Sequence, residues 1–141
     1  MLTYIDSIFF NPSVTNAPDL RKFLRMAFHD CMGGCDGSLN FSNPDNGGLP
    51  GHASTVVRGY QTALNPKKSS ARTVELFSKI SRADFWVLSS TRALGWGMKA
   101  GKSSPSYYSG SVFLYGRISA STYDSDSYEG PSGFPDGIHN W

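Results

Sequence analysis

The clearest pattern along the chain is a stripe of apolar residues at helical spacing between residues 20 and 31. Its members are Leu20, Phe23, Leu24, Ala27, Phe28 and Cys31. A repeat of this kind is typical of an amphipathic helix with one face in the core. Asn16 and Pro18 precede the stripe as helix-start residues, with Asp19 near the positive helix end. Gly33-Gly34 should end the helix near Cys31.

Three weaker patterns predict further helices over about residues 53–64, 71–80 and 83–94. The last of them is largely apolar, so we expect it to be buried, and Gly95-Trp-Gly should end it. Residues 40–50 are rich in Asn, Ser, Pro, Asp and Gly and predict a loop. The chain therefore reads as helices joined by polar turns.

The pattern weakens toward the carboxyl end. Residues 111–115 are predicted as a short strand, and from Arg117 onward the chain has little periodicity and few residues able to fill a core. We expect this tail to pack on something else. No repeat and no domain boundary is evident, so residues 1–141 are predicted to form a single, mainly α domain with little or no β structure.

Composition narrows the class of protein further. Thirteen basic and 11 acidic side chains give a formal charge of +2, which is too balanced to predict a nucleic acid or an anionic membrane as partner. No apolar run approaches the roughly 18–20 residues that span a bilayer. The first ten residues lack a basic segment and contain Asp6, so they do not predict a signal peptide. The sequence predicts no oligomeric state.

Two polar side chains border the apolar stripe. Arg25 and His29 are four residues apart, which places them side by side on one face of the predicted helix. Arginine keeps its charge and offers several donors, whereas histidine titrates near neutral pH and serves as both base and acid. Alone, His29 would be interpreted as an ordinary histidine at the core edge. Beside Arg25 it becomes a candidate catalytic base.

The turn after this helix gathers possible metal ligands. Asp30, Asp36 and Ser38 offer the oxygen atoms that a hard cation prefers, although a solvated polar turn has the same composition. Cys31 and Cys35 are either a short-loop disulfide, which would imply an oxidising compartment, or free thiols. Zinc on the two cysteines and the nearby histidine lacks a convincing fourth ligand and would consume the candidate base.

These motifs together resemble a known family. Arg25-x-x-Phe28-His29-Asp30-Cys31 followed by Gly34-Cys35-Asp36-Gly37-Ser38 resembles the distal haem signature of the plant, fungal and bacterial haem peroxidase superfamily. Later landmarks of that family are resembled, in the same order, by Asn46-Gly-Gly-Leu49, Ile80-Ser-Arg-Ala-Asp84-Phe, Gly116-Arg117 and Phe134-Pro135-Asp136. The resemblance implies the distal helical half of the haem peroxidase fold, with haem b as cofactor.

The resemblance also implies residue roles. His29 would take a proton from hydrogen peroxide and return it to the leaving oxygen, while Arg25 would stabilise the negative charge that builds as the O–O bond breaks. Phe28 would pack along the haem face, and Asn46 would hydrogen-bond the other ring nitrogen of His29 and raise its basicity. The second substrate would be a small aromatic or phenolic donor, with Pro135 at its binding site.

A distal calcium site is implied as well. Asp30, Asp36 and Ser38 would supply side-chain oxygens, and carbonyls around Gly33 and Gly34 would complete the shell. The Cys31–Cys35 pair would be a disulfide in an extracellular protein, although its interval is one residue shorter than in the secreted plant enzymes. The sequence departs from the family where an acid usually follows the Gly-Arg pair. Ser119 occupies that position, so we expect a structural ion pair to be missing.

The iron of this family is held by a proximal histidine on a later helix. The chain ends at Trp141 before that segment, so we expect a fragment that is inactive alone. Two alternatives are a non-catalytic, calcium-binding and disulfide-stabilised extracellular module and a helical structural domain without a ligand.

The remaining notable side chains are predicted to be structural. His52 should be exposed at a helix start, and His139 lies well before the position of the family's iron ligand. Asp84 is predicted to be a helix-start residue or a buried structural acid. Trp86 and Trp96 are predicted to serve packing rather than electron transfer.

Overall fold

The helices of the protein follow the predicted order. The computed structural model describes residues 1–10, 20–32, 34–100 and 115–124, with only the backbone described for 97–100. Their regular elements are α1 (Leu2–Phe9), α2 (Leu20–Met32), the 3-10 turn η2 (Pro44–Asn46), α3 (Pro50–Leu64), α4 (Ala71–Phe77) and α5 (Arg82–Ala100). These residues contain no strand beyond an isolated bridge between Leu39 and Asp124. The prediction of a mainly α fold with little or no β structure is confirmed.

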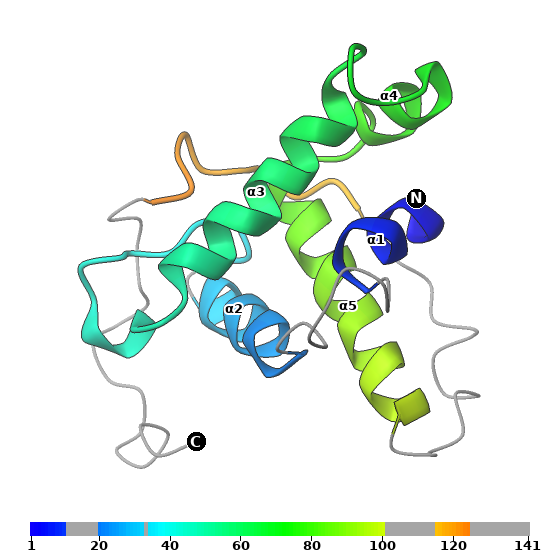
Figure 1. The fold of residues 1–141 in the computed structure, drawn as a ribbon. Helices are drawn as coiled ribbons and strands as arrows, with labels where there is room; N and C mark the ends of the chain where they lie inside the picture. The colour runs from blue at the N-terminus through cyan, green and yellow to red at the C-terminus, as the bar shows by residue number, and fades with distance from the viewer. Residues whose placement is uncertain (11–19, 33, 101–114, 125–141) are drawn as a thin grey trace.

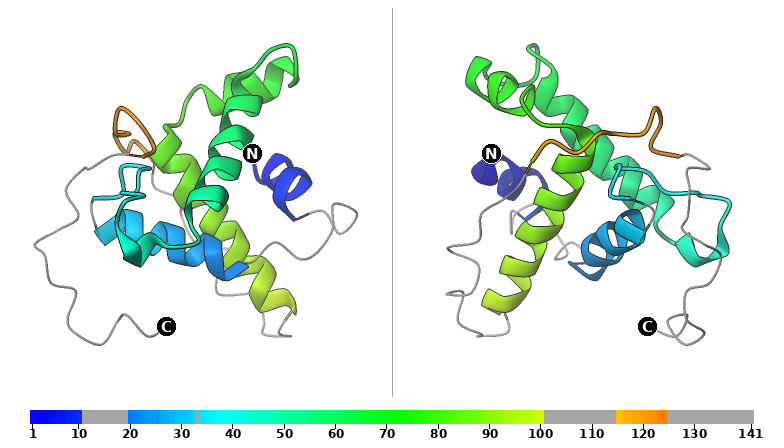
Figure 2. Two further views of the ribbon diagram at one scale, coloured as in Figure 1. Left: turned by 60° about the vertical axis from the view of Figure 1, so that its left-hand side comes forward. Right: turned by 180° about the vertical axis from the view of Figure 1, so that it is seen from behind.

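Helix α5 is the central element (Figure 1). α2 packs against it more extensively than any other two helices pack together, and α1 and α3 also contact it. α3 crosses α5, and α4 packs beside the far end of α3. The turned views in Figure 2 show the segment 115–124 passing across the amino end of α5, next to the loop that follows α2. This arrangement brings two loops together at one end of the central helix.

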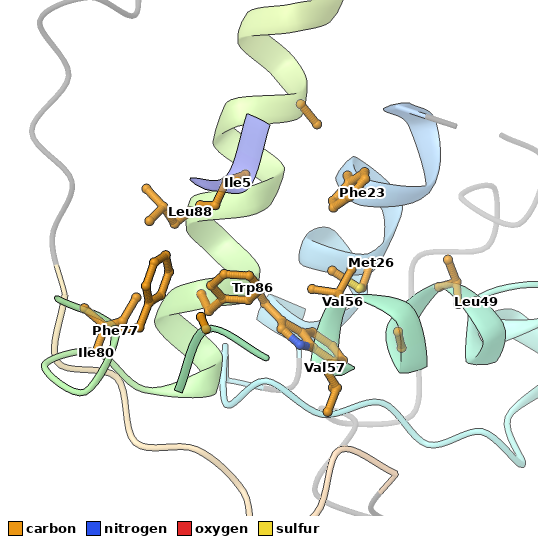
Figure 3. Packing of buried hydrophobic residues seen from close by; sticks show 14 of the residues in the cluster. Ile5, Phe23, Met26, Leu49, Val56, Val57, Phe77, Ile80, Trp86 and Leu88 are labelled. Atoms are coloured by element: carbon orange, nitrogen blue, oxygen red, sulfur yellow. The ribbon is translucent and has the colours of Figure 1, made fainter. Parts of the chain in front are cut away.

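The core is built from side chains that every α-helix contributes (Figure 3). Phe23 and Met26 of α2 are fully buried, as is Trp86 of α5. Burying each such side chain contributes roughly 1.5–3 kcal/mol before the entropy cost of ordering it. Trp86 therefore serves packing, as predicted. The other buried apolar side chains of the core are Ile5, Phe10, Leu39, Leu49, Ala53, Val56, Val57, Ala63, Phe77, Ile80, Phe85, Leu88 and Ala93.

Three helix boundaries differ from the predictions, and one of them is the end of α4, which lies at Phe77 rather than near residue 80. α3 begins at Pro50, three residues before the predicted start, because proline in the first turn suits a helix that needs no amide donor there. α5 continues past Gly95 to Ala100, so the predicted end at Gly95-Trp-Gly is wrong. A glycine costs a helix only about 1 kcal/mol relative to alanine. Contacts of Trp96 with α1 offset that cost.

Helix α1 was not predicted, because it is short and its sequence shows no clear start signal. Its Asp6 carboxylate accepts hydrogen bonds from Arg92 at 2.6 and 2.5 Å and from the Trp96 indole at 2.9 Å. The Trp96 ring also stacks on Phe10 with a centroid distance of 6.1 Å. Ile5 is buried in the core. One ion pair and a few apolar contacts thus hold α1 on α5.

Some predictions fall outside the described residues. They are the helix start at Asn16, Pro18 and Asp19, most of the strand over 111–115, and the expectations for Pro135 and His139. Within the described part of the chain, no helix combines the length and the apolar character needed to cross a membrane.

Candidate functional site

The predicted apolar stripe of α2 divides into two faces. Phe23 is 1% exposed and Met26 is 0% exposed, whereas Leu24 is 39% exposed and Phe28 is 47% exposed. The face of the helix that enters the core therefore includes Phe23 of the stripe but not Leu24 or Phe28. Each residue of a helix turns by about 100°, so the buried face passes through Phe23 and Met26 to Asp30, and the neighbouring face through Leu24 and Phe28 stays accessible.

Arg25 and His29 lie on the border of the accessible face, and one loop holds both. The Arg25 guanidinium donates to the carbonyl of Gly47 at 3.0 Å and to the carbonyl of Asp45. The His29 Nδ1 atom lies 2.7 Å from the Asn46 side-chain oxygen. Three consecutive residues, 45–47, thus hold a fixed cation and an imidazole one helical turn apart. The two groups point the same way, toward this loop.

The orientation of Asn46 fixes the proton on His29. The Asn46 amide nitrogen donates to the carbonyl of Asn40 at 2.8 Å, so its oxygen must face the imidazole. An oxygen there accepts a hydrogen bond, which places the proton on Nδ1 and leaves the lone pair on Nε2. Asn46 is itself buried in η2, whose amino end is capped by Asn43. The loop therefore supports the tautomer that a base at Nε2 requires.

The turn after α2 holds a buried carboxylate with one unsatisfied oxygen. Asp30 Oδ1 accepts from the amides of Gly37 at 2.9 Å and Ser38 at 3.4 Å, whereas Oδ2 is buried and has no hydrogen-bond partner among the described residues. The Ser38 hydroxyl donates to Asp36 at 2.6 Å. Burial raises the pKa of Asp30 to about 7, and the charge of Asp36 adds to that effect, against the backbone hydrogen bonds.

This donor set suits a hard cation. Two carboxylates and a hydroxyl lie within nine residues of chain, and the orphaned Asp30 oxygen is an acceptor that a cation would satisfy. The described residues hold no group of three His, Cys, Asp or Glu side chains placed for a metal, so backbone carbonyls and hydroxyls would complete the shell. Gly34 lies in the same turn with φ +125, a conformation that favours glycine.

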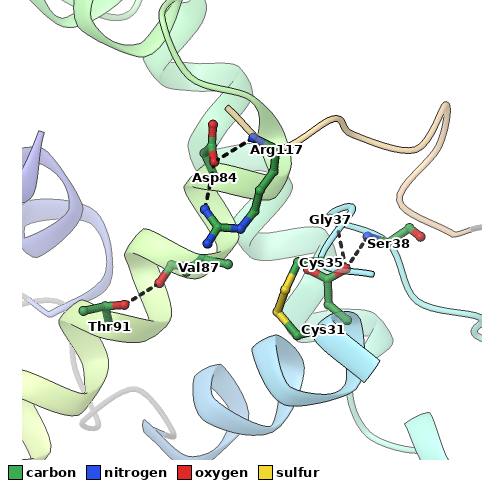
Figure 4. The surroundings of a disulfide bond; sticks show 9 residues. Cys31, Cys35, Gly37, Ser38, Asp84, Val87, Thr91 and Arg117 are labelled. Carbon is green, nitrogen blue, oxygen red and sulfur yellow. Dashed lines mark hydrogen bonds and ion pairs between the residues drawn. A yellow bond between two sulfur atoms is a disulfide. The ribbon is translucent and has the colours of Figure 1, made fainter. Parts of the chain in front are cut away.

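The cysteines of this turn are bonded to each other. Cys31, at the end of α2, and Cys35 form a disulfide beside the Asp30 loop (Figure 4). Of the two alternatives left by the sequence, the structure has the disulfide. A disulfide leaves no thiolate for zinc, which removes the zinc alternative.

Asp84, at the amino end of α5, contrasts with Asp30 because both of its carboxylate oxygens accept hydrogen bonds. Ser81 and Asp84 form a reciprocal capping box, at 3.0 and 3.3 Å. Asp84 also accepts from the Gly116 amide at 2.9 Å. The Arg117 guanidinium donates to the same carboxylate at 3.0 Å (Figure 4). Burial alone would raise the pKa of Asp84, but these hydrogen bonds outweigh it and lower the pKa. The prediction of a helix-start, buried structural acid is confirmed.

Ser119 does not leave Arg117 without an ion pair. Arg117 pairs with Asp84, and the Ser119 hydroxyl accepts instead from the amide of Ala83 at 3.1 Å. The expected loss of the ion pair that an acid at position 119 would form stays a prediction, because the Arg117–Asp84 pair does not involve that position. Serine at position 119, where the family usually has an acid, thus still provides a hydrogen-bond acceptor for the first turn of α5.

Sequence reasoning missed Arg82, which joins two loops to α5. Its guanidinium donates to the carbonyls of Gly37 at 2.8 Å, Ala120 at 2.7 Å and Thr122 at 3.0 Å. A cation in the first turn of a helix opposes the helix dipole, and this unfavourable position was the available signal for a specific partner. Gly37 permits the close approach, because a side chain there would meet the Ala83 backbone at 2.8 Å.

His52 is half-buried rather than exposed, so that expectation is wrong. Its ring packs edge-on against Phe23 with a centroid distance of 4.4 Å. This contact lies on the buried face of α2, where Phe23 is 1% exposed. His52 thus has a packing role next to the core.

The fold and the site define a helical protein that carries a cation and an imidazole on an accessible apolar face. A sequence model described as Peroxidase matches residues 5–133, which is most of the chain. The protein belongs to the peroxidase family, in agreement with the resemblance of its motifs, and membership indicates an oxidoreductase of a kind that generally binds haem. Comparison with curated proteins and with solved structures gives no significant match.

Proposed function

We propose that this chain forms the distal side of a haem-dependent peroxidase, which reduces hydrogen peroxide and oxidises a small aromatic or phenolic donor. One observation carries the proposal: residues 45–47 hold Arg25 and His29 together beside the accessible apolar face of α2. A cation and a base in this relation suit the cleavage of a polar O–O bond, in which a proton moves and negative charge develops.

The accessible face has the character that a porphyrin requires. Leu24 and Phe28 are large apolar side chains with 39% and 47% exposure, and exposed apolar surface of this kind marks a binding site or an interface. Phe28, Arg25 and His29 would therefore line the distal side of the haem. The haem would supply the electron-transfer chemistry that amino-acid side chains cannot perform.

The protein would handle the proton. His29 Nε2 would accept a proton from hydrogen peroxide and deliver it to the departing oxygen, so that water can leave. The Asn46 oxygen on Nδ1 would stabilise the imidazolium between these two transfers. Arg25 uses two of its five N–H donors on the loop carbonyls, and the others would stabilise the oxygen that becomes negative. Two electrons and two protons from donor molecules complete the reduction of the peroxide to two molecules of water.

We further propose that Asp30, Asp36 and Ser38, with the Gly34 carbonyl, bind Ca²⁺. The unsatisfied, buried Asp30 oxygen supports this assignment, because an isolated buried acceptor is costly and a cation would satisfy it. The same observation is what favours the alternative function, a non-catalytic calcium-binding module. The disulfide supports an extracellular location, since such bonds persist in oxidising compartments.

The decisive experiment is a haem titration followed by peroxide addition. Haem iron in this family takes an axial histidine, so free imidazole is added to supply a ligand of that kind. The wild-type chain is compared with His29→Ala and Arg25→Ala, and with Lys22→Ala as an exposed control on the same helix. Haem uptake is followed by absorbance, and peroxide reaction by stopped flow.

We expect both site variants to take up haem, while the rate of reaction with peroxide falls about 10²–10⁴-fold for His29→Ala and by at least 10² for Arg25→Ala. Lys22→Ala should react at the wild-type rate. If the site variants react as fast as the wild type, the catalytic assignment is wrong. Failure of the wild type to bind haem while it still binds Ca²⁺ would favour the non-catalytic module.

A further inference from the structure

The loop that orients His29 is itself held by a distant segment. Two amides in this loop donate to residues 123–124: the Leu39 amide bonds the Tyr123 carbonyl at 3.1 Å, and the Phe41 amide bonds the Asp124 carboxylate at 3.1 Å. Asn40 lies between these two donors. Its carbonyl is the acceptor that fixes the Asn46 amide at 2.8 Å. Both neighbours of that carbonyl are thus tied to one short segment.

We propose that Asp124 is a positioning residue for His29, and this inference rests on the proposed function. The connection runs from the Asp124 carboxylate to the Phe41 amide, through the Asn40 carbonyl to the Asn46 amide, and from the Asn46 oxygen to His29 Nδ1. Each step is a direct hydrogen bond or a shared peptide. Together with the Asn43 amide, which donates to the same carbonyl at 3.2 Å, Asp124 sets where the Asn40 carbonyl points, and so which end of the Asn46 amide meets the imidazole.

The segment is anchored well enough to serve this purpose. Arg82 donates to the carbonyls of Ala120 and Thr122, and the Ala120 amide donates to the Asp36 carbonyl at 2.9 Å. The Tyr123 ring also packs on Phe41 with a centroid distance of 5.9 Å. Figure 2 shows the segment lying along the loop at the amino end of α5. Asp124 therefore acts from a fixed backbone rather than from a loose end.

Loss of the Asp124 acceptor affects the imidazole in a defined direction. If the Asn40 carbonyl moves away, the Asn46 amide is no longer required to present its oxygen to His29. A rotated amide would present N–H groups, which favour the tautomer with the proton on Nε2. That tautomer cannot accept a proton from peroxide. Because one hydrogen bond contributes about 1 kcal/mol, the tautomer ratio should change about fivefold.

The test compares Asp124→Ala with Asp124→Asn in the haem-free chain. Asparagine keeps an oxygen acceptor for the Phe41 amide, whereas alanine removes it. Glu75→Ala is the control, since Glu75 is an exposed acid of α4 that pairs only with Lys79 among the contacts of the structure. The ¹⁵N chemical shifts of the His29 ring report the tautomer directly, and the thermal midpoint reports folding. The rate of the haem-loaded variants with peroxide is measured in parallel.

We expect the Nδ1–H tautomer in the wild type, Glu75→Ala and Asp124→Asn, with about a fivefold lower tautomer ratio in Asp124→Ala. The peroxide rate of Asp124→Ala should fall only in proportion to the fraction of the Nδ1–H tautomer, so by less than the ratio itself. A wild-type tautomer ratio in folded Asp124→Ala would overturn the inference and leave the proposed function standing. Equal losses in both Asp124 variants would also overturn it, because charge rather than the acceptor atom would then matter. An Nε2–H tautomer in the wild type would instead overturn the base assignment of the proposed function.

Discussion

The two faces of α2 differ in what covers them. On the buried face, Phe23 and Met26 pack within the core, and the buried Ser90 hydroxyl of α5 donates to the Phe23 carbonyl at 2.7 Å. On the accessible face, Leu24 and Phe28 remain half exposed, and the adjacent polar groups are held by the loop at 45–47. One helix thus serves both the core and a binding surface. The comparison shows that apolar periodicity marks both faces without distinguishing them.

The two buried aspartates, Asp84 and Asp30, differ in the same way, because only one of them has hydrogen-bond partners among the described residues for both carboxylate oxygens. Asp84 uses both carboxylate oxygens on Ser81, Gly116 and Arg117, and its pKa is lowered. Asp30 satisfies one oxygen and leaves the other buried without a partner, and its pKa is raised. Asp84 thus needs no further hydrogen-bond partner and has a structural role, whereas the free oxygen of Asp30 is suited to binding a cation.

The largest expected effect comes from substituting the same residue type on the two faces. Phe23→Ala should lower the free energy of unfolding by about 3–5 kcal/mol, because it opens a cavity in the core. Phe28→Ala should change it by no more than about 0.5 kcal/mol, as for other exposed positions. Urea denaturation measures both values. Equal losses in the two variants would show that the faces are not different.

Calcium should have the next largest effect. Saturation at about 100 times the dissociation constant should stabilise the wild type by about 2.7 kcal/mol, and chelation should remove that gain. Asp36→Ala should not respond to either treatment, whereas Glu75→Ala, which alters an exposed acid on α4, should respond as the wild type does. Differential scanning calorimetry with and without chelator provides the comparison. A calcium response retained in Asp36→Ala would contradict the proposed ligand set.

Low pH should destabilise the folded protein by protonating Asp84. Because its pKa is lower in the folded protein than in the unfolded chain, the ionised group contributes stability above about pH 4, and this is lost as the pH falls through the folded pKa. The loss amounts to about 1.4 kcal/mol for each unit by which the pKa is lowered. Urea midpoints between neutral pH and pH 2 should fall less steeply for Asp84→Asn. Parallel curves for the two proteins would refute this role.

The sequence was informative where the signal is local. The spacing of Phe23, Arg25 and His29 predicted α2 and the placement of its two polar groups side by side, and Asp84 was predicted as a helix-start residue. Long-range contacts have no such signature. Three contacts illustrate this: Asp6 with Arg92, Arg82 with Ala120, and Asp124 with Phe41. Their partners lie 38–86 positions apart in the sequence, and several of them are in loops without a hydrophobic pattern.

The split of the apolar stripe of α2 could not be predicted for a related reason. Leu24 and Phe28 have the same hydrophobicity as the residues that enter the core, so only the placement of α5 and α3 decides which of them are covered. The same holds for Gly95, whose helix-breaking tendency is weaker than the contacts of Trp96 with α1.

Haem titration of Phe28→Asp, beside Leu2→Asp, tests most directly whether the accessible face of α2 binds the cofactor. Leu2 is a suitable control, since it is an apolar side chain of α1 with 48% exposure, much like that of Phe28. A carboxylate buried against an apolar ligand costs well over 1.4 kcal/mol, so Phe28→Asp should lower haem affinity more than about tenfold, while Leu2→Asp binds as the wild type does. Wild-type haem affinity in folded Phe28→Asp would contradict the account.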